Sequence, residues 1–354
     1  VELDRAREAM PGPLPKARTL DEPGGNPPPT FLRKRGDYYS PGPELSPAYP
    51  AVLTNEGPKI APMDRSSGRR AALASWLVRP DHPLTARVIV NRLWQHHMGR
   101  GIVATPSDFG RTGEPPSHPE LLDWLATELV TRQWDLKALH RLIVTSATYR
   151  QSAEESARAL KVDPENTLHW RHHRRRLDAE ALRDALLAVS GKLCSTMGGP
   201  GVFPDLPAEL TKLSGKGAIW PVSPRAGDRD RRSIYVFLRR NLRYPFFEAF
   251  DRPDTNASCP NRPITTIAPQ ALSLLNGKLA NEAARYLAQK IAHEAGLSVE
   301  TRIDQAYVVC LGRKPDNTEL VLATEFLGSS NVSSTGLADL ALALINLNEF
   351  VIIE

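Results

Sequence analysis

The sequence lacks most signatures of well-defined chemistry. Its three cysteines, Cys194, Cys259 and Cys310, lie far apart, and neither CxxC nor CxxCH occurs. This excludes a zinc ribbon, a thioredoxin-type motif and covalent haem attachment in this chain. GxSxG, the P-loop and the dinucleotide-binding fingerprint are also missing. We therefore predict no cofactor and no metal site of recognised pattern; three cysteines allow at most one disulfide.

Long apolar runs are missing as well. No stretch approaches the roughly 18 apolar residues that a transmembrane helix needs, so we expect no transmembrane segment. The first residues, VELDRAREAMPGPLP, lack the apolar core of a signal peptide. The chain begins with Val1 and not with a methionine. We expect a processed or excised piece of a longer protein, whose upstream part could complete a site.

Proline is the residue in excess. The chain has 31 prolines among 354 residues, well above the usual share of about 5%, which predicts many turns and extended connections. Apolar residues make up 41% and the net charge is +5. That charge is small for a chain of this length, so we do not expect a nucleic acid as partner.

Hydrophobic spacing predicts a mainly α fold: a helical body with long, ordered Pro/Gly-rich loops and at most a small β ribbon. Residues 1–65 read as an extended N-terminal strap, anchored by Phe31, Leu32, Tyr38, Tyr39, Tyr49, Val52 and Leu53. Residues 66–160 and 161–354 are expected to form an N-terminal and a C-terminal helical lobe. A polar loop at 244–267 is expected at their junction.

Local patterns predict individual elements within this plan. TFLRKRGDY favours a short strand, and RRSIYVFLRRN, which is rich in β-branched and aromatic residues, is the best strand candidate. In the C-terminal part, apolar spacing predicts helices at about 268–295, 299–311, 316–327 and 335–349.

Several long blocks carry a family resemblance. They include RKRGDYYSPGPELSPAYPAVL, LTARVIVNRLWQHHMGRGIVATPSDFGRTGEPPSHPELLDWLA and RRSIYVFLRRNLRYPFFEAFDRPDTNASCPNRPITTIAPQALSLLN. In this order they resemble the planctomycete-specific C-terminal domain of unknown function, from about Arg33 to Glu354. The resemblance implies a bacterial, extracytoplasmic protein, periplasmic or exported, and a c-type cytochrome module or protein as a possible partner. It implies no reaction.

The polar loop is the first candidate site. It is bordered by Glu248, Asp251 and Asp254 and continues with Asn256, Asn261 and Arg262. Carboxylates beside amides and an arginine suit the recognition of sugar hydroxyls or two-carboxylate glycoside chemistry. Loop carboxylates also suit calcium, for which the sequence gives no other support. The alternative is a structural loop whose Asp and Asn side chains bond their own backbone.

Arginines and histidines form the second group of candidates. Arg175, Arg239, Arg240 and His172 belong to clusters of basic residues. Arginine forks bind carboxylates, sulfates and phosphates, so a sulfated or uronic polysaccharide is one possible ligand. Internal ion pairs with nearby carboxylates are the other interpretation of these clusters.

Three functional hypotheses remain open on the sequence. The first is an extracytoplasmic module that binds or processes polysaccharide through the loop and the arginines. The second is a structural or docking module for a c-type cytochrome. The third is a hydrolase whose site is not visible in sequence, and whether the chain is an enzyme stays open.

Overall fold

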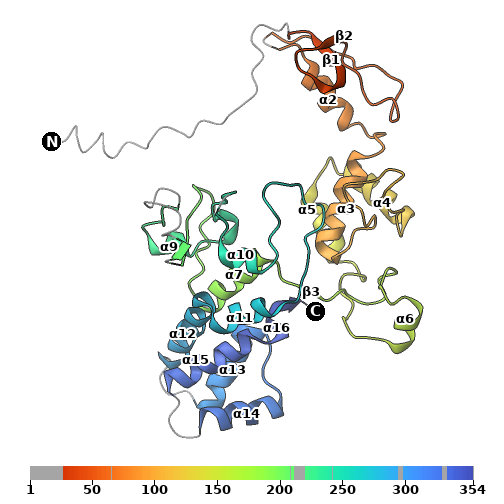
Figure 1. The fold of residues 1–354 in the computed structure, drawn as a ribbon. Coiled ribbons are helices and arrows are strands. Elements are labelled where there is room, and N and C mark those ends of the chain that lie inside the picture. Colours follow the sequence, from red (N-terminus) through yellow and green to blue (C-terminus); the bar gives the residue numbers. More distant parts are fainter. Residues whose placement is uncertain are drawn as a thin grey trace, which may run out of the picture. The chain divides into compact units, whose positions relative to one another are not determined.

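The computed structural model describes residues 27–64, 66–207, 209–210, 220–240, 242–293, 298–328 and 333–353. Within them the fold is mainly helical, with fourteen α-helices, two 3-10 helices and two small two-stranded antiparallel sheets (Figure 1). This confirms the predicted fold class. The part of the predicted strap before residue 27 lies outside the described residues. Among the helices described, none has both the length and the apolar character to cross a bilayer.

The chain divides into two compact units. The first contains the described residues up to Val90 together with Glu120–Leu136, and the second contains Asn91–Pro119 and Lys137–Glu354. The lobe boundaries predicted near residues 65 and 160 stay predictions. All candidate site residues belong to the second unit.

The first unit opens with a β-hairpin. Strand β1 (Thr30–Arg33) pairs antiparallel with β2 (Pro41–Leu45) and is followed by the 3-10 helix η1 (Lys34–Gly36). The strand predicted in TFLRKRGDY is thereby confirmed. Tyr38, Tyr39 and Val52, expected as anchors, are instead 70%, 88% and 90% exposed. Tyr38 and Tyr39 lie in the segment that connects β1 to β2. A two-stranded sheet has no further layer that could bury them.

Aromatic stacking fastens the rest of the strap to α2 (Arg69–Leu77). The rings of Tyr49 and Trp76 stack with centroids 4.4 Å apart, and the Tyr49 hydroxyl donates to the Ala72 carbonyl at 3.1 Å. The His82 ring meets the other side of this pair edge-on. Its Nδ1 accepts from the Thr85 backbone N–H at 3.1 Å, at the start of α3 (Thr85–Met98). Tyr49 is therefore an anchor, as predicted. The unit also contains most of α4 (Pro119–Thr131).

The core of the second unit is built around α12 (Lys278–His293) and α15 (Ser334–Ile345). Its other elements are α5 (Leu136–Val144), α6 (Ala157–Val162), β3 (Arg175–Arg176), α7 (Ala179–Val189), α9 (Ala226–Arg229), η2 (Ser233–Tyr235), α10 (Pro245–Ala249), α11 (Ala268–Asn276), α13 (Val299–Leu311), α14 (Asn317–Leu327), α16 (Asn348–Val351) and β4 (Ile352–Ile353).

Alanines make the contact between α12 and α15 close. The buried residues of α12 follow a helical spacing and are mostly small: Ala280, Ala283, Ala284, Leu287, Ala288 and Ile291. They face the apolar side of α15, while α7, α11 and α13 pack around α12. A side chain of one methyl group lets two helix axes approach, so longer residues on α15 can fill the space between them.

Two predicted elements were wrong in detail. RRSIYVFLRRN forms no strand within the described residues; it contains η2 and takes part in two isolated bridges, Cys194 with Arg231 and Val202 with Val236. The Asp184 carboxylate accepts from the Ser233 N–H at 2.7 Å, which bends the backbone there. The helix expected at 268–295 is two helices, α11 and α12, separated at Gly277. A Cβ on Gly277 would lie 2.0 Å from the Ser273 carbonyl oxygen, so this sharp break depends on glycine.

Candidate functional site

The polar loop begins at a buried aromatic anchor. Phe247 on α10 and Phe250 just after it are 1% and 3% exposed and belong to the core of the second unit, and Phe246 packs beside them. The next residue, Asp251, has a φ of 60°. This left-handed conformation, which Asp tolerates better than most residues, turns the chain away from the core. The phenylalanines thus hold the front of the loop.

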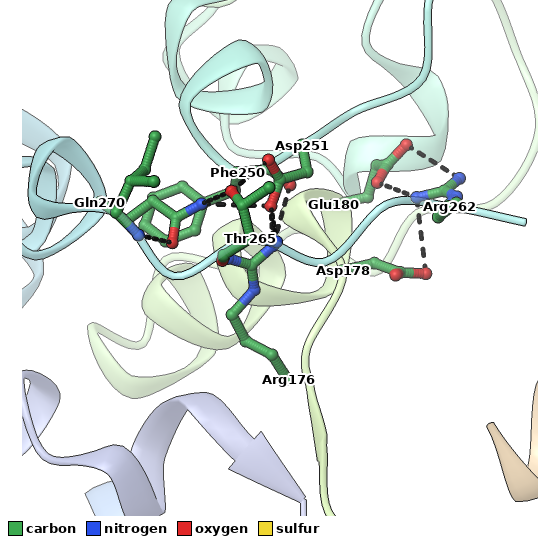
Figure 2. Close-up of polar contacts among 9 residues, drawn as sticks. Arg176, Asp178, Glu180, Phe250, Asp251, Arg262, Thr265 and Gln270 are labelled. Atoms are coloured by element: carbon green, nitrogen blue, oxygen red, sulfur yellow. Dashed lines mark hydrogen bonds and ion pairs between the residues drawn. The ribbon is translucent and has the colours of Figure 1, made fainter.

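Asp251 is the centre of a hydrogen-bonded network (Figure 2). Its carboxylate accepts from Arg176 Nη2 at 2.6 Å, from the Thr265 N–H at 2.9 Å and from the Thr265 hydroxyl at 2.7 Å. Gln270 Nε2 donates to it at 3.1 Å, while Gln270 Oε1 accepts from the Ile267 N–H at the start of α11. The loop is therefore fastened at both ends to one carboxylate.

The position of Arg176 follows from the second sheet. Arg176 pairs with Ile352 where β3 and β4 run antiparallel, and the Leu177 N–H donates to the Val351 carbonyl at 2.8 Å. From this strand the guanidinium also donates to the Thr265 carbonyl at 2.7 Å. Burial alone would raise the pKa of the Asp251 carboxyl, but the bonds from Thr265 and Arg176 outweigh burial and hold that pKa below its usual value. Asp251 is therefore ionised, and its carboxylate oxygens are occupied by hydrogen bonds within the chain.

A second carboxylate holds the middle of the loop. Glu180, in the first turn of α7, accepts from Arg262 at 2.7 and 3.3 Å and lies 3.1 Å from Arg252 Nε. Asp178 lies 3.4 Å from the same Arg262 (Figure 2). Burial would raise the pKa of Glu180, but the hydrogen bond from Arg262 and the charges of both arginines lower it. Arg262, predicted to bind a ligand, is thus engaged by the protein's own carboxylates.

The remaining loop candidates also bond within the chain. Glu248 and Asp254 lie 3.7 and 3.1 Å from Arg243, and the Asn256 N–H donates to Asp254 at 2.9 Å. Asn261 donates to the Ala104 carbonyl at 3.3 Å and accepts a short hydrogen bond from the Gln95 amide. The alternative to a binding site was a structural loop whose side chains bond within the chain. These contacts are of that kind.

The four basic candidates are not brought together. Arg175 donates to the His96 carbonyl, and the buried His172 packs its ring against Tyr149. Arg239 and Arg240 follow η2 and form no ion pair with any described residue. The cavity nearest the loop, which Arg239 and Glu248 help to line, measures ≈ 20 Å³. Since one water occupies about 30 Å³ in the liquid, this space is too small for a sugar.

A ligand-sized space lies elsewhere, on the surface formed by α11, α12 and α15. We call it the α12–α15 groove; its volume is ≈ 610 Å³, within the roughly 300–1,000 Å³ typical of ligand sites. Its lining residues are Leu275, Asn276, Lys278, Asn281, Ala284, Arg285, Gln289, Ser334, Thr335, Ala338, Asp339 and Leu342. Amides, hydroxyls and two cations thus surround small apolar residues.

This groove was not predicted from the sequence. Asn281, Arg285 and Gln289 are spaced by four along α12, so they form one polar stripe on a helix whose opposite side is buried. That stripe is visible in KLANEAARYLAQKIAH. The facing residues of α15 lie about 50 positions further along the chain, and only the fold brings them opposite.

The described residues give little support for a metal site or for acid–base catalysis. In the part of the chain that the structure describes, no group of three or more His, Cys, Asp or Glu is placed to hold a metal ion. The shifted carboxyl pKa values at the loop, those of Glu180, Asp251 and Asp254, are all lowered. A glycoside hydrolase needs one carboxylic acid with a raised pKa as proton donor.

Comparison with known families gives a firm assignment. The model of the PSD1 family, described as a protein of unknown function (DUF1553), matches residues 69–327. The chain belongs to the PSD1 family. The match starts at the first residue of α2 and ends at the last residue of α14. No curated protein and no solved structure matches the chain.

The PSD1 match covers the polar loop and the polar stripe of α12 but ends before α15. One wall of the α12–α15 groove therefore lies within the matched region and the other lies beyond it. The family description assigns no activity, so the function must be argued from the residues.

Proposed function

We propose that the chain is an extracytoplasmic module that binds an acidic or sulfated polysaccharide in the α12–α15 groove. The observation that carries the proposal is the polar stripe Asn281, Arg285 and Gln289, which faces hydroxyl-bearing residues of α15 across an open space of ≈ 610 Å³.

The groove lining suits the two faces of a sugar ring. Ala284, Ala338 and Leu342 supply apolar surface for the C–H face of the ring. The Gln289 amide can donate to and accept from the sugar hydroxyls, and the Asn281 amide oxygen can accept from them. Asn281 Nδ2 already donates to the Leu275 and Gly277 carbonyls at 2.9 and 3.1 Å. Its orientation is therefore set before a ligand binds.

Charge favours an acidic polymer. Lys278, Arg285 and one carboxylate, Asp339, line the groove. Lys278 lies 3.8 Å from Glu282, so the preference for an acidic ligand rests on Arg285. Arg285 Nε donates to the Asn281 carbonyl at 3.1 Å, and no described carboxylate lies within ion-pair distance of its guanidinium. The terminal nitrogens can therefore form the paired hydrogen bonds that arginine makes to sulfate or carboxylate groups.

Binding is favoured over processing. Every described carboxyl group whose pKa is shifted has it lowered, including Glu180 and Asp251 of the polar loop. Such groups are ionised at neutral pH and do not donate the proton that departure of a sugar requires. The resemblance to planctomycete domains that follow cytochrome c modules supports the extracytoplasmic location in this proposal.

Docking to a c-type cytochrome is the second candidate, and a separate surface favours it. Ile234, Phe237 and Leu238 are 75%, 41% and 46% exposed and precede the arginines Arg239 and Arg240. Exposed apolar side chains beside arginines are typical of protein interfaces. A complex with a c-type cytochrome that is weakened by Phe237→Ala and Arg240→Ala would support this candidate, and its absence in gel filtration of the mixed proteins would exclude it.

Calorimetric titration of the purified chain tests the main proposal. The ligands are a sulfated, a uronic and a neutral polysaccharide at low ionic strength. We expect binding of the two acidic polymers that weakens with added salt, because arginine and lysine contribute through charge. Equal affinity for all three polymers would remove the acidic preference, and no binding of any of them would exclude the proposed function.

A further inference from the structure

A second cavity lies in the second unit, and one of its lining residues, Ala104, accepts a hydrogen bond from Asn261 of the polar loop. We call it the histidine pocket. Its volume is ≈ 210 Å³, and three segments line it: 100–104 after α3, 114–117 before α4, and 166–173 before β3. This volume lies below the roughly 300–1,000 Å³ of typical ligand sites. The pocket therefore suits one small ring.

The segment 166–173 is held rigidly in an unusual conformation. His169 and Asn166 have φ values of 56° and 52°, in the left-handed region. Asn166, which is 1% exposed, donates to the Arg171 carbonyl at 2.8 Å, and Gln151 donates to the His169 carbonyl at 2.7 Å. Asn and His adopt this region more readily than most residues, and the hydrogen bonds of Asn166 and Gln151 fix the segment in it.

Imidazole rings gather at one side of this pocket. The His169 ring has its centroid 5.7 Å from that of His173, 5.6 Å from that of His118 and 5.3 Å from that of Trp94. Burial and the neighbouring His173 lower the pKa of His169 to about 4, and burial lowers that of His173 as well. Both rings are therefore neutral at pH 7, and a neutral imidazole offers one hydrogen-bond donor and one acceptor.

The other charges of the pocket cancel. Arg100 Nη2 lies 3.3 Å from Glu114 Oε2, so the pocket carries one positive and one negative side chain. Glu114 would repel an anion in the pocket, and Arg100 would repel a cation. The pocket has no net charge that would offset either repulsion. The lining favours a ligand without charge.

The remaining lining residues combine hydroxyls with apolar surface. The Thr167 hydroxyl can donate and accept, the Ser117 hydroxyl lies 3.3 Å from the Ile102 carbonyl and 3.0 Å from His118 Nδ1, and Ile102, Ala104, Pro115 and Pro116 are apolar. The Thr167 backbone is fixed, because its N–H donates to Asp163 Oδ1 at 2.9 Å. Mixed donors and acceptors around an apolar floor match a molecule that has hydroxyls at its edge and C–H groups on its face.

We propose that the histidine pocket binds one neutral, hydroxyl-rich ring of the size of a single monosaccharide. This site is independent of the α12–α15 groove, since the two cavities share no residue. It differs from the groove in charge as well as size. The groove carries Lys278 and Arg285 against Asp339, whereas the pocket is balanced.

Histidine-selective NMR of the full chain at pH 7 provides the test. D-glucose, D-galactose and D-mannose are titrated separately, with potassium sulfate as the anionic comparison. At least one sugar should shift the His169 and His173 ring signals in a saturable way, and sulfate should not. Thr167→Val should weaken that sugar about tenfold, the equivalent of one lost hydrogen bond of about 1.4 kcal/mol. Thr324→Val, on α14, should leave the affinity unchanged.

Several outcomes would overturn the proposal. One is that no sugar shifts either ring, and another is that sulfate produces the shifts instead. A third is that Thr167→Val and Thr324→Val bind the sugar equally well, with the fold of Thr167→Val verified by its unchanged amide spectrum. Arg285→Ala serves to separate the two sites: it should weaken polysaccharide binding in the groove about tenfold or more and leave the histidine signals and their sugar response unchanged.

Discussion

Arg176 donates a 2.6 Å hydrogen bond to Asp251 across 75 positions of sequence, and the two side chains are 11% and 13% exposed. The pair joins β3 to Asp251, which lies in the polar loop two residues after the end of α10. A charge pair this protected from water is costly to break, because the remaining partner stays buried without a counter-charge. The polar loop that the sequence predicts as a binding site is therefore held in place by some of its own candidate residues.

Replacement of Asp251 should affect stability rather than ligand binding. Asp251→Ala leaves Arg176 unpaired and removes three further hydrogen bonds, so we expect a loss of about 3 kcal/mol in the free energy of unfolding. Urea denaturation measures this loss. Asp254→Ala is the matched control: its carboxylate is half exposed beside Arg243, so we expect less than about 1 kcal/mol. Equal losses in the two variants would contradict a structural role for the network.

Acid should destabilise the protein through His169. Burial lowers its pKa from 6.5 to about 4 in the folded chain, so between these values the unfolded chain binds the proton and the folded chain does not. The contribution of His169 to the free energy of unfolding is therefore fully present above pH 6.5 and is lost as the pH falls toward 4. Below pH 4, His169 causes no further loss. His97, His172 and His173, whose pKa values burial also lowers, act in the same direction.

The contribution of His169 can be isolated with His169→Asn, because asparagine tolerates the left-handed backbone. From pH 6.5 to pH 4, the wild type should lose about 2 kcal/mol more than this variant, allowing for partial exposure of the ring. Urea denaturation across this pH range provides the values. Parallel curves for the two proteins would show that His169 is protonated as easily in the folded chain as in the unfolded one.

The three thiols should differ in reactivity. All three cysteines are free in the structure, and burial raises the pKa of Cys310 to about 12. A bond with Thr196 lowers the pKa of Cys194, and Cys259 is exposed. Because the thiolate is the reactive form, a chromogenic disulfide reagent should modify Cys194 and Cys259 in the native protein and Cys310 only after unfolding. Rapid reaction of all three native thiols would place Cys310 in contact with solvent.

Local elements were predictable where a periodic pattern determines them. The helix expected at 299–311 is α13 with the same bounds, and the helix at 316–327 is α14. The break at Gly277 was not predictable from periodicity, because the apolar pattern is helical on both sides of it. The strand expected in RRSIYVFLRRN had the right residue types, but a side chain from α7, Asp184, fixes its backbone in another conformation.

The candidate site was harder to predict because its side chains bond to residues from distant parts of the chain. Sequence shows that Glu248, Asp251 and Asp254 are close to one another, but not that Arg176 and Arg243 reach them. A carboxylate paired with an arginine and one that faces solvent look alike in a sequence. Likewise, the polar stripe of α12 can be found by spacing, while its partner α15 is identified only by packing.

The most direct test of the account compares groove variants with loop variants for the same sulfated polysaccharide. We predict that Arg285→Ala and Gln289→Ala each weaken binding about tenfold or more, the equivalent of one lost charged or paired hydrogen bond. Asp254→Ala and Asn256→Ala, in the polar loop, should bind as the wild type does. Loss of affinity in the loop variants with unchanged binding by the groove variants would contradict the account and return the site to the loop.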